Sequence, residues 1–418
     1  MAVQDIRLLP VVGDDHSREW PHGVVDAEFL DSIGWRPAPI RQFLFKVHTR
    51  CNLNCDYCYV YEMADQSWRD KPIRMSTAVV DAAARRIGEH AGAHGLDEVR
   101  VILHGGEPLL AGTEFITYVR DTVTAALPSG TRVSFGMQSN GALIDADIVK
   151  LCLELRLSVG VSLDGDRIAN DRHRLYKNGN SSYDKVLAGI DQLRNSGAPQ
   201  MFTGILCTID LTNDPLDTYR SFIELGAPAI DFLLQHGNWS DPPPMWGSAD
   251  ETNYADWLIP IFDEWFHALK RPVRIRFFEE IINLLLGGHS QVETIGLTPA
   301  TLVVIEVNGA IEQVDALKSA YDGAAETGTN VFANTFDEAL ALPGLAARQI
   351  GADALPDKCR TCPIVRTCGG GYYPHRYLRG IGFNNPSVYC ADLTKLIGHI
   401  DATLTAAIER RQSLGGSR

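Results

Sequence analysis

Three cysteines stand close together early in the chain, at Cys51, Cys55 and Cys58. Their C-x3-C-x2-C spacing directly follows an apolar run, residues 43–47, that is typical of a strand. Three thiolates on one compact loop can hold three irons of a [4Fe–4S] cube and leave the fourth iron open for chemistry. The alternative is a structural zinc loop, which needs four ligands, usually from two C-x2-C pairs. The loop therefore favours a catalytic iron–sulfur cluster.

Four more cysteines lie near the carboxyl end of the chain. They are Cys359, Cys362, Cys368 and Cys390. Four thiolates saturate either a zinc ion or a [4Fe–4S] cube, and the spacing alone does not choose between them. The remaining two cysteines, Cys152 and Cys207, fall within a predicted helix and a predicted strand, where core packing is the expected role.

The elements that must position these cysteines alternate between short apolar runs and amphipathic helices from residue 42 to about 235. We expect strands at 42–47, 99–104, 132–138, 157–163, 201–209 and 230–234. Of the helices between them, we expect Ser76 and Thr113 to cap the first two, Asp145 and Ser182 to lead the next two, and Pro215 to lie in the first turn of the last. Six βα units predict an α/β fold, a partial (β/α)6 TIM-like barrel whose chemistry lies at the carboxyl ends of its strands. The cysteine loop follows the first strand, so we expect it at that rim.

The pattern predicts four segments along the chain. Residues 1–36 form an N-terminal extension, expected to be irregular or peripheral like the last eight residues, and residues 37–235 form the barrel. Residues 236–290 form a helical connecting segment, with helices at 254–269 and 277–286. Residues 291–418 form a small Cys-rich domain with a strand at 302–307 and a C-terminal helix.

Composition limits the cellular setting. A net charge of −14 over 418 residues argues against non-specific binding of nucleic acid, which needs a basic surface. No apolar run approaches the ~20 residues that span a membrane, and the first residues lack a signal-peptide pattern. We therefore expect a cytoplasmic protein, with no membrane partner and with its nine cysteines reduced.

A second motif follows the second predicted strand. His104, Gly105, Gly106 and Glu107 resemble the GGE segment of radical S-adenosylmethionine (SAM) enzymes. The resemblance implies that SAM binds the open iron, while the glycine backbone and the Glu107 carboxylate hold its ammonium group. Two glycines allow close approach of the backbone to a ligand, and a carboxylate is a fitting partner for an ammonium.

The next strand ends complete the resemblance. Asn140 follows strand three in a segment similar to one that borders the SAM pocket, and Ser162 ends strand four. In this family the serine meets the ribose or carboxylate of SAM, and an arginine at the offset of Arg174 clamps the carboxylate. Tyr57 is expected along the adenine.

The C-terminal cysteines resemble the SPASM domain, which holds auxiliary clusters in radical SAM enzymes that act on peptides. Tyr372 stands where the usual pattern has a cysteine, and no cysteine lies near Gly309. The resemblance therefore implies one fully ligated auxiliary [4Fe–4S] cluster. Residues 46–62, 278–282, 311–318 and 368–377 resemble FxsB-type radical SAM/SPASM maturases, over about residues 36–400.

That resemblance implies a reaction on a ribosomally made precursor peptide. A hydrogen leaves the β-carbon of one residue, and that carbon then joins an aromatic ring to form a cyclophane. The expected proton acceptor is one of Glu279, Glu280, Asp315 and His236, with Glu279 and Asp315 as the leading catalytic candidates. The alternatives are thioether crosslinking, formylglycine-type oxidation, or a non-catalytic zinc-binding module.

The same resemblance implies two partners. One is the precursor peptide, expected as an extended strand on a sheet edge and bound without a separate leader-binding domain. The other is an electron donor of the flavodoxin or ferredoxin type.

Overall fold

The computed structural model describes residues 19–415, and its centre is one ten-stranded sheet. The strand order is β10-β9-β8-β1-β2-β3-β4-β5-β6-β7. The strands are β1 (Gln42–His48), β2 (Glu98–Gly105), β3 (Arg132–Ser139), β4 (Leu157–Ser162), β5 (Phe202–Thr208), β6 (Ala229–Leu233), β7 (Arg274–Ile275), β8 (Leu302–Ile305), β9 (Ala310–Glu312) and β10 (Glu326–Asn330). All neighbours from β8 to β7 pair in parallel, whereas β9 and β10 add antiparallel strands at one edge.

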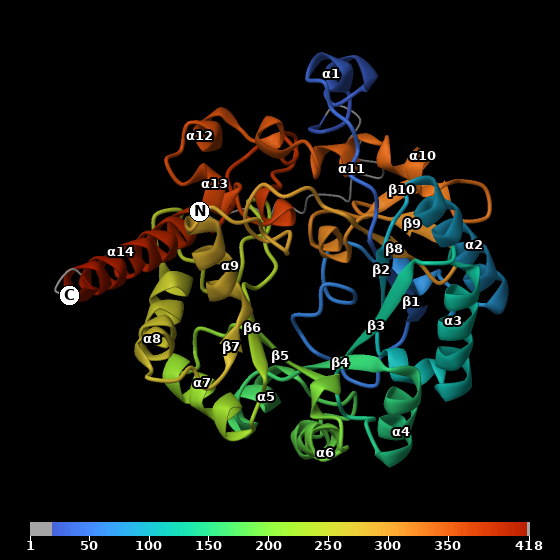
Figure 1. Cartoon of the computed structure of the whole chain (residues 1–418), viewed down its shortest axis with the longest axis horizontal. Helices are drawn as coiled ribbons and strands as arrows, with labels where there is room; N and C mark the ends of the chain where they lie inside the picture. Colours follow the sequence, from blue (N-terminus) through green and yellow to red (C-terminus); the bar gives the residue numbers. More distant parts are fainter. Residues whose placement is uncertain (1–18, 416–418) are drawn as a thin grey trace, which may run out of the picture.

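Helices surround the sheet, which curves into an open ring (Figure 1). The helices are α1 (Ala27–Ser32), α2 (Thr77–Ala93), α3 (Thr113–Ala126), α4 (Ala146–Leu155), α5 (Arg167–His173), α6 (Tyr183–Arg194), α7 (Pro215–Glu224), α8 (Asn253–His267), α9 (Arg276–Leu285), α10 (Phe336–Leu340), α11 (Pro343–Ala347), α12 (Asp357–Arg360), α13 (Val365–Cys368) and α14 (Cys390–Gly415). This arrangement confirms the predicted α/β barrel class.

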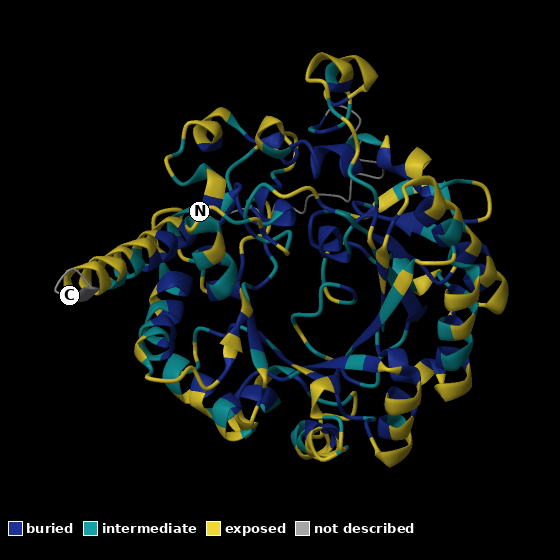
Figure 2. Cartoon of the chain, viewed as in Figure 1, coloured by how far each residue is buried: buried dark blue, intermediate teal, exposed yellow. Residues whose placement is uncertain are grey.

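The apolar spacing of the sequence explains how each helix lies against the sheet. On α2 the side chains of Val79, Val80, Ala83 and Ile87 are buried, and its outer face is exposed (Figure 2). Ser76 caps this helix by accepting a hydrogen bond from the backbone N–H of Val79, as predicted. Burial of one stripe on each helix thus holds the ring of strands in place.

One helix start differs from the prediction, and another makes an unexpected contact. Thr113 is the first residue of α3 and not its cap, because Gly112 makes the preceding turn with a φ of +86°. Ser182 occupies the cap position of α6, but its hydroxyl donates 2.5 Å to the carbonyl of Arg174 instead of capping the helix. This bond ties the start of α6 to the segment that carries Arg174.

The C-terminal part shares the barrel's sheet. β8 pairs in parallel with β1, so strands on both sides of the predicted boundary near residue 290 lie side by side. The boundary itself stays a prediction, while the short strands β7, β9 and β10 were not predicted.

The described parts of both chain ends contain helical residues and are not wholly irregular. Within residues 19–36, α1 is helical, and Val25 and Leu30 pack in an apolar cluster with Leu317 and Tyr373. At the other end, α14 runs to Gly415 and projects away from the ring (Figure 1). Residues 1–18 and 416–418 of the expected terminal segments lie outside the described residues. No helix in the described range is long and apolar enough to cross a membrane.

Candidate functional site

The three-cysteine loop lies inside the ring, at the carboxyl end of β1 (Figure 1). It borders a cavity of about 410 Å³. The predicted site residues that line this cavity are Cys51, Cys55, Tyr57, Cys58, His104, Gly105, Gly106, Asn140, Ser162, Arg174, His236 and Asp315. The structure therefore brings together strand ends that are separated by more than two hundred residues of sequence.

The cysteine loop is held by its own backbone and by Asn140. The N–H of Cys58 donates to the carbonyl of Cys55 at 3.2 Å, which closes a turn between these two thiols. The Cys51 sulfur accepts from the N–H of Leu53 at 3.4 Å and from Asn140 Nδ2 at 3.5 Å. Burial raises the pKa of Cys51 to about 12 and that of Cys58 to about 11. Without a metal these groups are therefore thiols at pH 7, and a metal that binds them replaces their protons.

The spacing of the cysteine sulfurs favours an iron–sulfur cube over a zinc ion. Within residues 19–415, only two groups of three or more His, Cys, Asp or Glu place their ligand atoms within 4.8 Å of one another, and neither contains a cysteine. Sulfurs on a tetrahedral zinc ion lie about 3.8 Å apart, given a Zn–S bond of about 2.3 Å. Both cysteine sets are therefore spread more widely than zinc requires, which fits ligands at the corners of a cube.

The segment after β2 packs directly against the cysteine loop. A Cβ atom at Gly106 would lie 2.4 Å from the carbonyl oxygen of Arg50, so only glycine fits there. The next residue, Glu107, is fully buried but does not line the cavity. Its carboxylate accepts from Leu109 N at 3.0 Å, Ser139 Oγ at 2.9 Å and Asn140 N at 2.8 Å, and so joins the ends of β2 and β3.

A chain of polar side chains crosses the cavity wall from the loop to β4. Arg174 is buried and donates from Nη1 to the Tyr57 hydroxyl at 2.7 Å, and that hydroxyl donates to Asp164. Asp164 is fixed in turn by the N–H of Thr208 at 3.0 Å. The Arg174 Nε has no partner within the described chain, so the guanidinium keeps a donor for a ligand carboxylate. Asp164 was not among the predicted site residues, because only the fold brings it to Tyr57.

On the opposite wall, Asp315 meets residues of β1 and β2. Its Oδ2 lies 2.7 Å from Lys46 Nζ and 3.9 Å from His104 Nδ1. Burial alone would raise the pKa of Asp315, but Lys46 and Lys318 outweigh this effect and lower the pKa to about 2. Burial and the Lys46 charge lower the pKa of His104 to about 4, so this imidazole is neutral at pH 7.

The carboxylate of Asp315 belongs to a larger buried group of charges. Lys71 lies 2.6 Å and Lys318 3.1 Å from Glu312, and both also contact Glu306. Glu306, Glu312 and Asp315 form one of the two groups whose ligand atoms are close enough for a metal ion. Three lysines neutralise these three acids, so we interpret the group as a structural network.

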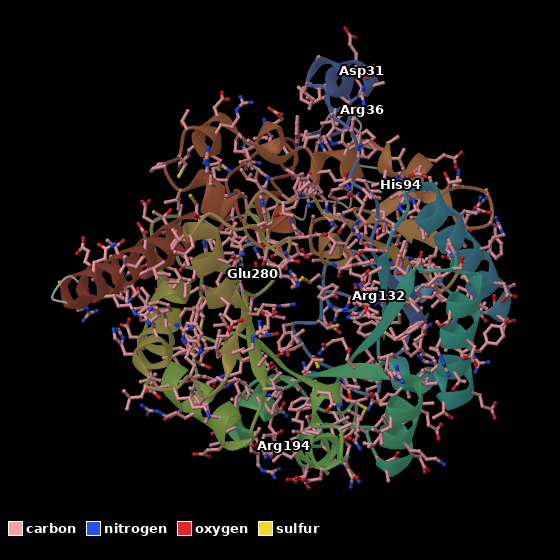
Figure 3. All side chains as sticks on the ribbon, in the orientation of Figure 1. Asp31, Arg36, His94, Arg132, Arg194 and Glu280 are labelled. Atoms are coloured by element: carbon pink, nitrogen blue, oxygen red, sulfur yellow. The ribbon has the colours of Figure 1, made fainter. Side chains whose placement is uncertain are left out.

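The structure does not bring every candidate base to the cavity. Glu279 pairs with Arg274, with Nη2 and Oε2 2.7 Å apart, and does not line the cavity. Glu280, labelled on α9 in Figure 3, accepts from the N–H of Gln291 at 3.0 Å and does not line the cavity either. Asp315 and His236 are the two candidates that do.

His236 belongs to an aromatic wall that sequence reasoning did not predict. Its ring lies 4.8 Å from Tyr59, 5.9 Å from His375 and 6.3 Å from Tyr372, measured between ring centroids. Burial lowers the pKa of His236 to about 4, so it faces the cavity as a neutral ring. Tyr372 and His375 follow Cys368, so this wall connects the cavity to the second cysteine set.

The second cysteine set lies on two short helices and at the start of the long helix α14. Cys359 lies on α12, Cys368 ends α13, and Cys390 begins α14. Burial, together with the nearby thiols of Cys390 and Cys359, raises the pKa of Cys368 to about 12, so these thiols are close enough to interact. The Cys359 thiol interacts in the same way with Cys390 and Cys362. Four thiols at one place can saturate a cube and leave no open iron.

Comparisons with known proteins agree with this geometry. Residues 45–223 match the Radical SAM superfamily. A serine-type anaerobic sulfatase-maturating enzyme of Klebsiella aerogenes is 26% identical over 352 residues, which cover 81% of each chain. A cysteine-type enzyme of Clostridium novyi is 25% identical over 272 residues, 64% of this chain and 71% of the relative.

Solved structures show the same fold. The structure of native anSMEcpe with bound AdoMet and Cp18Cys peptide has a TM-score of 0.76 at 20% identity, and the match covers 89% of this chain and 99% of the other. Streptococcus suis SuiB bound to its precursor peptide SuiA has a TM-score of 0.55 at 14% identity, covering 87% and 78%.

Residues 45–223 therefore carry the sequence pattern of the Radical SAM superfamily, and the chain is similar to the anaerobic sulfatase-maturating enzymes over most of its length. The similar anSMEcpe structure contains bound AdoMet. In this chain, Cys51, Cys55 and Cys58 fit a catalytic [4Fe–4S] cluster, and the C-terminal cysteine set fits an auxiliary one. The FxsB-type resemblance stays a prediction, as do the individual SAM contacts.

Proposed function

We propose that this enzyme oxidises a side chain of a peptide substrate, beginning with removal of a hydrogen from its β-carbon, as in formylglycine formation. The observation that carries the proposal is the single cavity lined both by the three-cysteine loop and by Tyr372 and His375, which follow the second cysteine set. A substrate side chain in this cavity lies between the two cluster sites. The relatives, which are named for sulfatase maturation, favour formylglycine-type oxidation.

The reaction needs one hydrogen acceptor, one proton acceptor and one electron acceptor. When bound to the open iron of the reduced catalytic cluster, SAM supplies a 5′-deoxyadenosyl group that takes the hydrogen atom. For a serine, the β-carbon radical then loses one electron and the hydroxyl loses its proton, which gives an aldehyde, so the peptide loses two hydrogens in total. The auxiliary cluster, with all its irons ligated, is the proposed electron acceptor, and a flavodoxin- or ferredoxin-type protein is the proposed external donor.

Within this proposal, His236 is the favoured proton acceptor. Its ring is neutral at pH 7 because burial lowers its pKa, and it lines the cavity. Asp315 lines the same cavity, but Lys46 engages one of its oxygens at 2.7 Å. The protein's other contributions are to orient the peptide and to exclude water around the reactive carbon.

The second candidate function is the crosslink between a β-carbon and an aromatic ring. The cysteine count favours it, because Cys152 is buried in α4 and Cys207 in β5. These positions leave four cysteines for auxiliary ligands in the described chain, enough for one auxiliary cluster. Enzymes of the formylglycine group usually carry two.

The test is a reaction of the anaerobically reduced, SAM-loaded enzyme with the Cp18Cys peptide, its serine variant, and a variant that adds a neighbouring tyrosine. We expect 5′-deoxyadenosine together with an aldehyde that reacts with a hydrazine reagent. A product two hydrogens lighter that resists hydrazine and carries a carbon–carbon bond to tyrosine supports the second candidate instead. Formation of 5′-deoxyadenosine with all three peptides unchanged contradicts both, and Cys55→Ala is the inactive control.

A further inference from the structure

Arg376 lies in the protein interior beside the second cysteine set. It is 6% exposed and ends a short turn, Tyr373–Arg376. Its Nη2 donates to the carbonyl of Gly369 at 2.8 Å and to that of Gly371 at 3.1 Å. Both carbonyls belong to the backbone that follows Cys368, so the guanidinium is held against the segment that carries this ligand. Its charge also acts on the thiols of Cys359 and Cys368.

No carboxylate pairs with Arg376 anywhere in residues 19–415. Its third hydrogen bond, from Nη1, goes to the carbonyl of Ala354 at 3.4 Å, and its Nε has no partner. Burial lowers the pKa of Arg376, and the neighbouring Tyr373, Cys359 and Cys368 oppose this effect. An arginine nevertheless stays protonated in proteins. A buried positive charge without a counter-charge is costly, so this site needs negative charge from another source.

Other buried cations near the two cluster sites face acids, and Arg174 does so through the Tyr57 hydroxyl, which donates to Asp164. Arg348 pairs with Glu293, and the lysines of the network described above face three acids. Arg376 is different, because the negative charge nearest to it arises only when Cys359 and Cys368 become thiolates on a bound cluster. The buried charge of Arg376 is therefore explained by the negative charge of a bound cluster, because no acidic side chain in the described residues balances it.

We propose that Arg376 is the counter-charge that raises the reduction potential of the auxiliary cluster. A [4Fe–4S] core with four thiolates is doubly negative when oxidised and triply negative when reduced. A fixed positive charge beside it in a medium of low dielectric favours the reduced form, and cluster potentials depend on net charge and burial. Arg376 thus makes the cluster a better acceptor for the single electron that leaves the substrate. This inference rests on the cluster at the four cysteines and not on the identity of the peptide.

The test is a redox titration of the intact enzyme, followed by electron paramagnetic resonance without any peptide. The auxiliary signal is the one that SAM does not perturb, because SAM binds only the open iron. We expect Arg376→Gln to lower the ratio of reduced to oxidised auxiliary cluster at least tenfold at a fixed potential, which equals 59 mV for one electron. Arg376→Lys keeps the charge and is expected to stay within threefold of the wild type at pH 7.

Two controls distinguish the effect of the Arg376 charge from other effects of the substitutions. The double variant Arg348→Gln/Glu293→Gln removes a neutral pair nearby and is expected to shift the ratio less than threefold. In Arg376→Lys the potential should fall towards that of Arg376→Gln as the buried ammonium deprotonates at high pH, while the wild type stays flat.

Three results overturn the proposal. They are an unchanged potential in Arg376→Gln, equal shifts in the Lys and Gln variants at pH 7, and a pH-independent potential in Arg376→Lys. If iron analysis shows that Arg376→Gln loses the cluster, the pH dependence of the potential in Arg376→Lys is the deciding measurement. Failure of any peptide to react leaves this inference untouched, because the potential is measured without substrate.

Discussion

At the scale of single residues, Arg174 on the cavity wall is the predicted partner of the SAM carboxylate. It donates to Tyr57 and keeps an unused Nε, which suits two-pronged binding of a carboxylate. Lysine carries the same charge but lacks the planar fork. We expect Arg174→Lys to weaken SAM binding about tenfold, or about 1.4 kcal/mol, measured by equilibrium dialysis with the reconstituted enzyme.

The matched control for this change lies two residues away. Arg172 pairs with Asp210 and does not line the cavity. Arg172→Lys should leave SAM binding within twofold. Equal losses in the two variants would show that Arg174 supports the fold and does not contact SAM.

Glu107 gives a prediction about pH. Burial raises its pKa to about 7, although three hydrogen bonds to the carboxylate and the charge of Arg174 oppose this effect. Lowering the pH through 7 therefore protonates Glu107 and weakens the hydrogen bonds by which it positions Asn140 at the cavity. We expect the dissociation constant of SAM to rise as the pH falls from 8 to 6, measured by the same dialysis. In Glu107→Gln this pH dependence should largely disappear, and an undiminished dependence would assign it to another group.

At the scale of elements, the buried charges connect β1, β8 and β9 to the turn that carries Asp315 and Lys318. Lys318 is 3% exposed and lies 3.1 Å from both Glu306 and Glu312. Lys318→Ala leaves these carboxylates short of positive charge in the interior. We expect a loss of about 3–5 kcal/mol in the free energy of unfolding, measured by anaerobic urea denaturation.

An exposed ion pair provides the comparison. Arg85 and Glu89 are about half exposed on α2, with Nη1 and Oε1 2.8 Å apart. Arg85→Ala should cost less than about 0.5 kcal/mol, because water screens the pair. An equally small loss in the free energy of unfolding for Lys318→Ala would show that the network of buried charges does not stabilise the folded protein.

The barrel elements were predictable because their signals are local. The six expected strands all appear within one residue or so at each end, since apolar runs and helix caps repeat along the sequence. The pairing of β8 with β1 was not predictable, because a four-residue apolar run does not show which distant strand it joins. The cap expected at Thr113 was wrong, because Gly112 makes the preceding turn and Thr113 is already the first residue of the helix.

The site was predictable to the same extent. Cys51, Glu107 and Arg174 lie in short motifs with informative spacing, so sequence alone singled them out. The contact between Lys46 and Asp315 joins residues far apart in the chain and depends on the β1–β8 pairing. The ion pair that holds Glu279 away from the cavity is likewise a property of the folded chain.

At the scale of the whole molecule, the two cysteine sets should be separable. We expect Cys359→Ser to remove about four iron atoms per chain while the catalytic cluster remains. Such an enzyme should still cleave SAM to 5′-deoxyadenosine but yield little oxidised peptide, because the electron from the substrate has no acceptor. Iron analysis and product quantification check both expectations.

Cys152→Ala is the control for this experiment. Cys152 is fully buried in α4 and belongs to neither set, so the variant should keep all its iron. Full peptide oxidation by Cys359→Ser would show that the electron leaves by a route other than the auxiliary cluster.

The position of β8 beside β1 also has a consequence for biosynthesis. On the ribosome, the strand that carries the cysteine loop emerges early, yet its neighbour on one side is made only after β2 to β7 and α2 to α9. Until then β1 has an unpaired edge, and Lys46 lacks its partner Asp315. Contacts of such large sequence separation form slowly. The pocket wall beside the catalytic cysteines is therefore completed late in folding, after nearly three quarters of the chain has been synthesised.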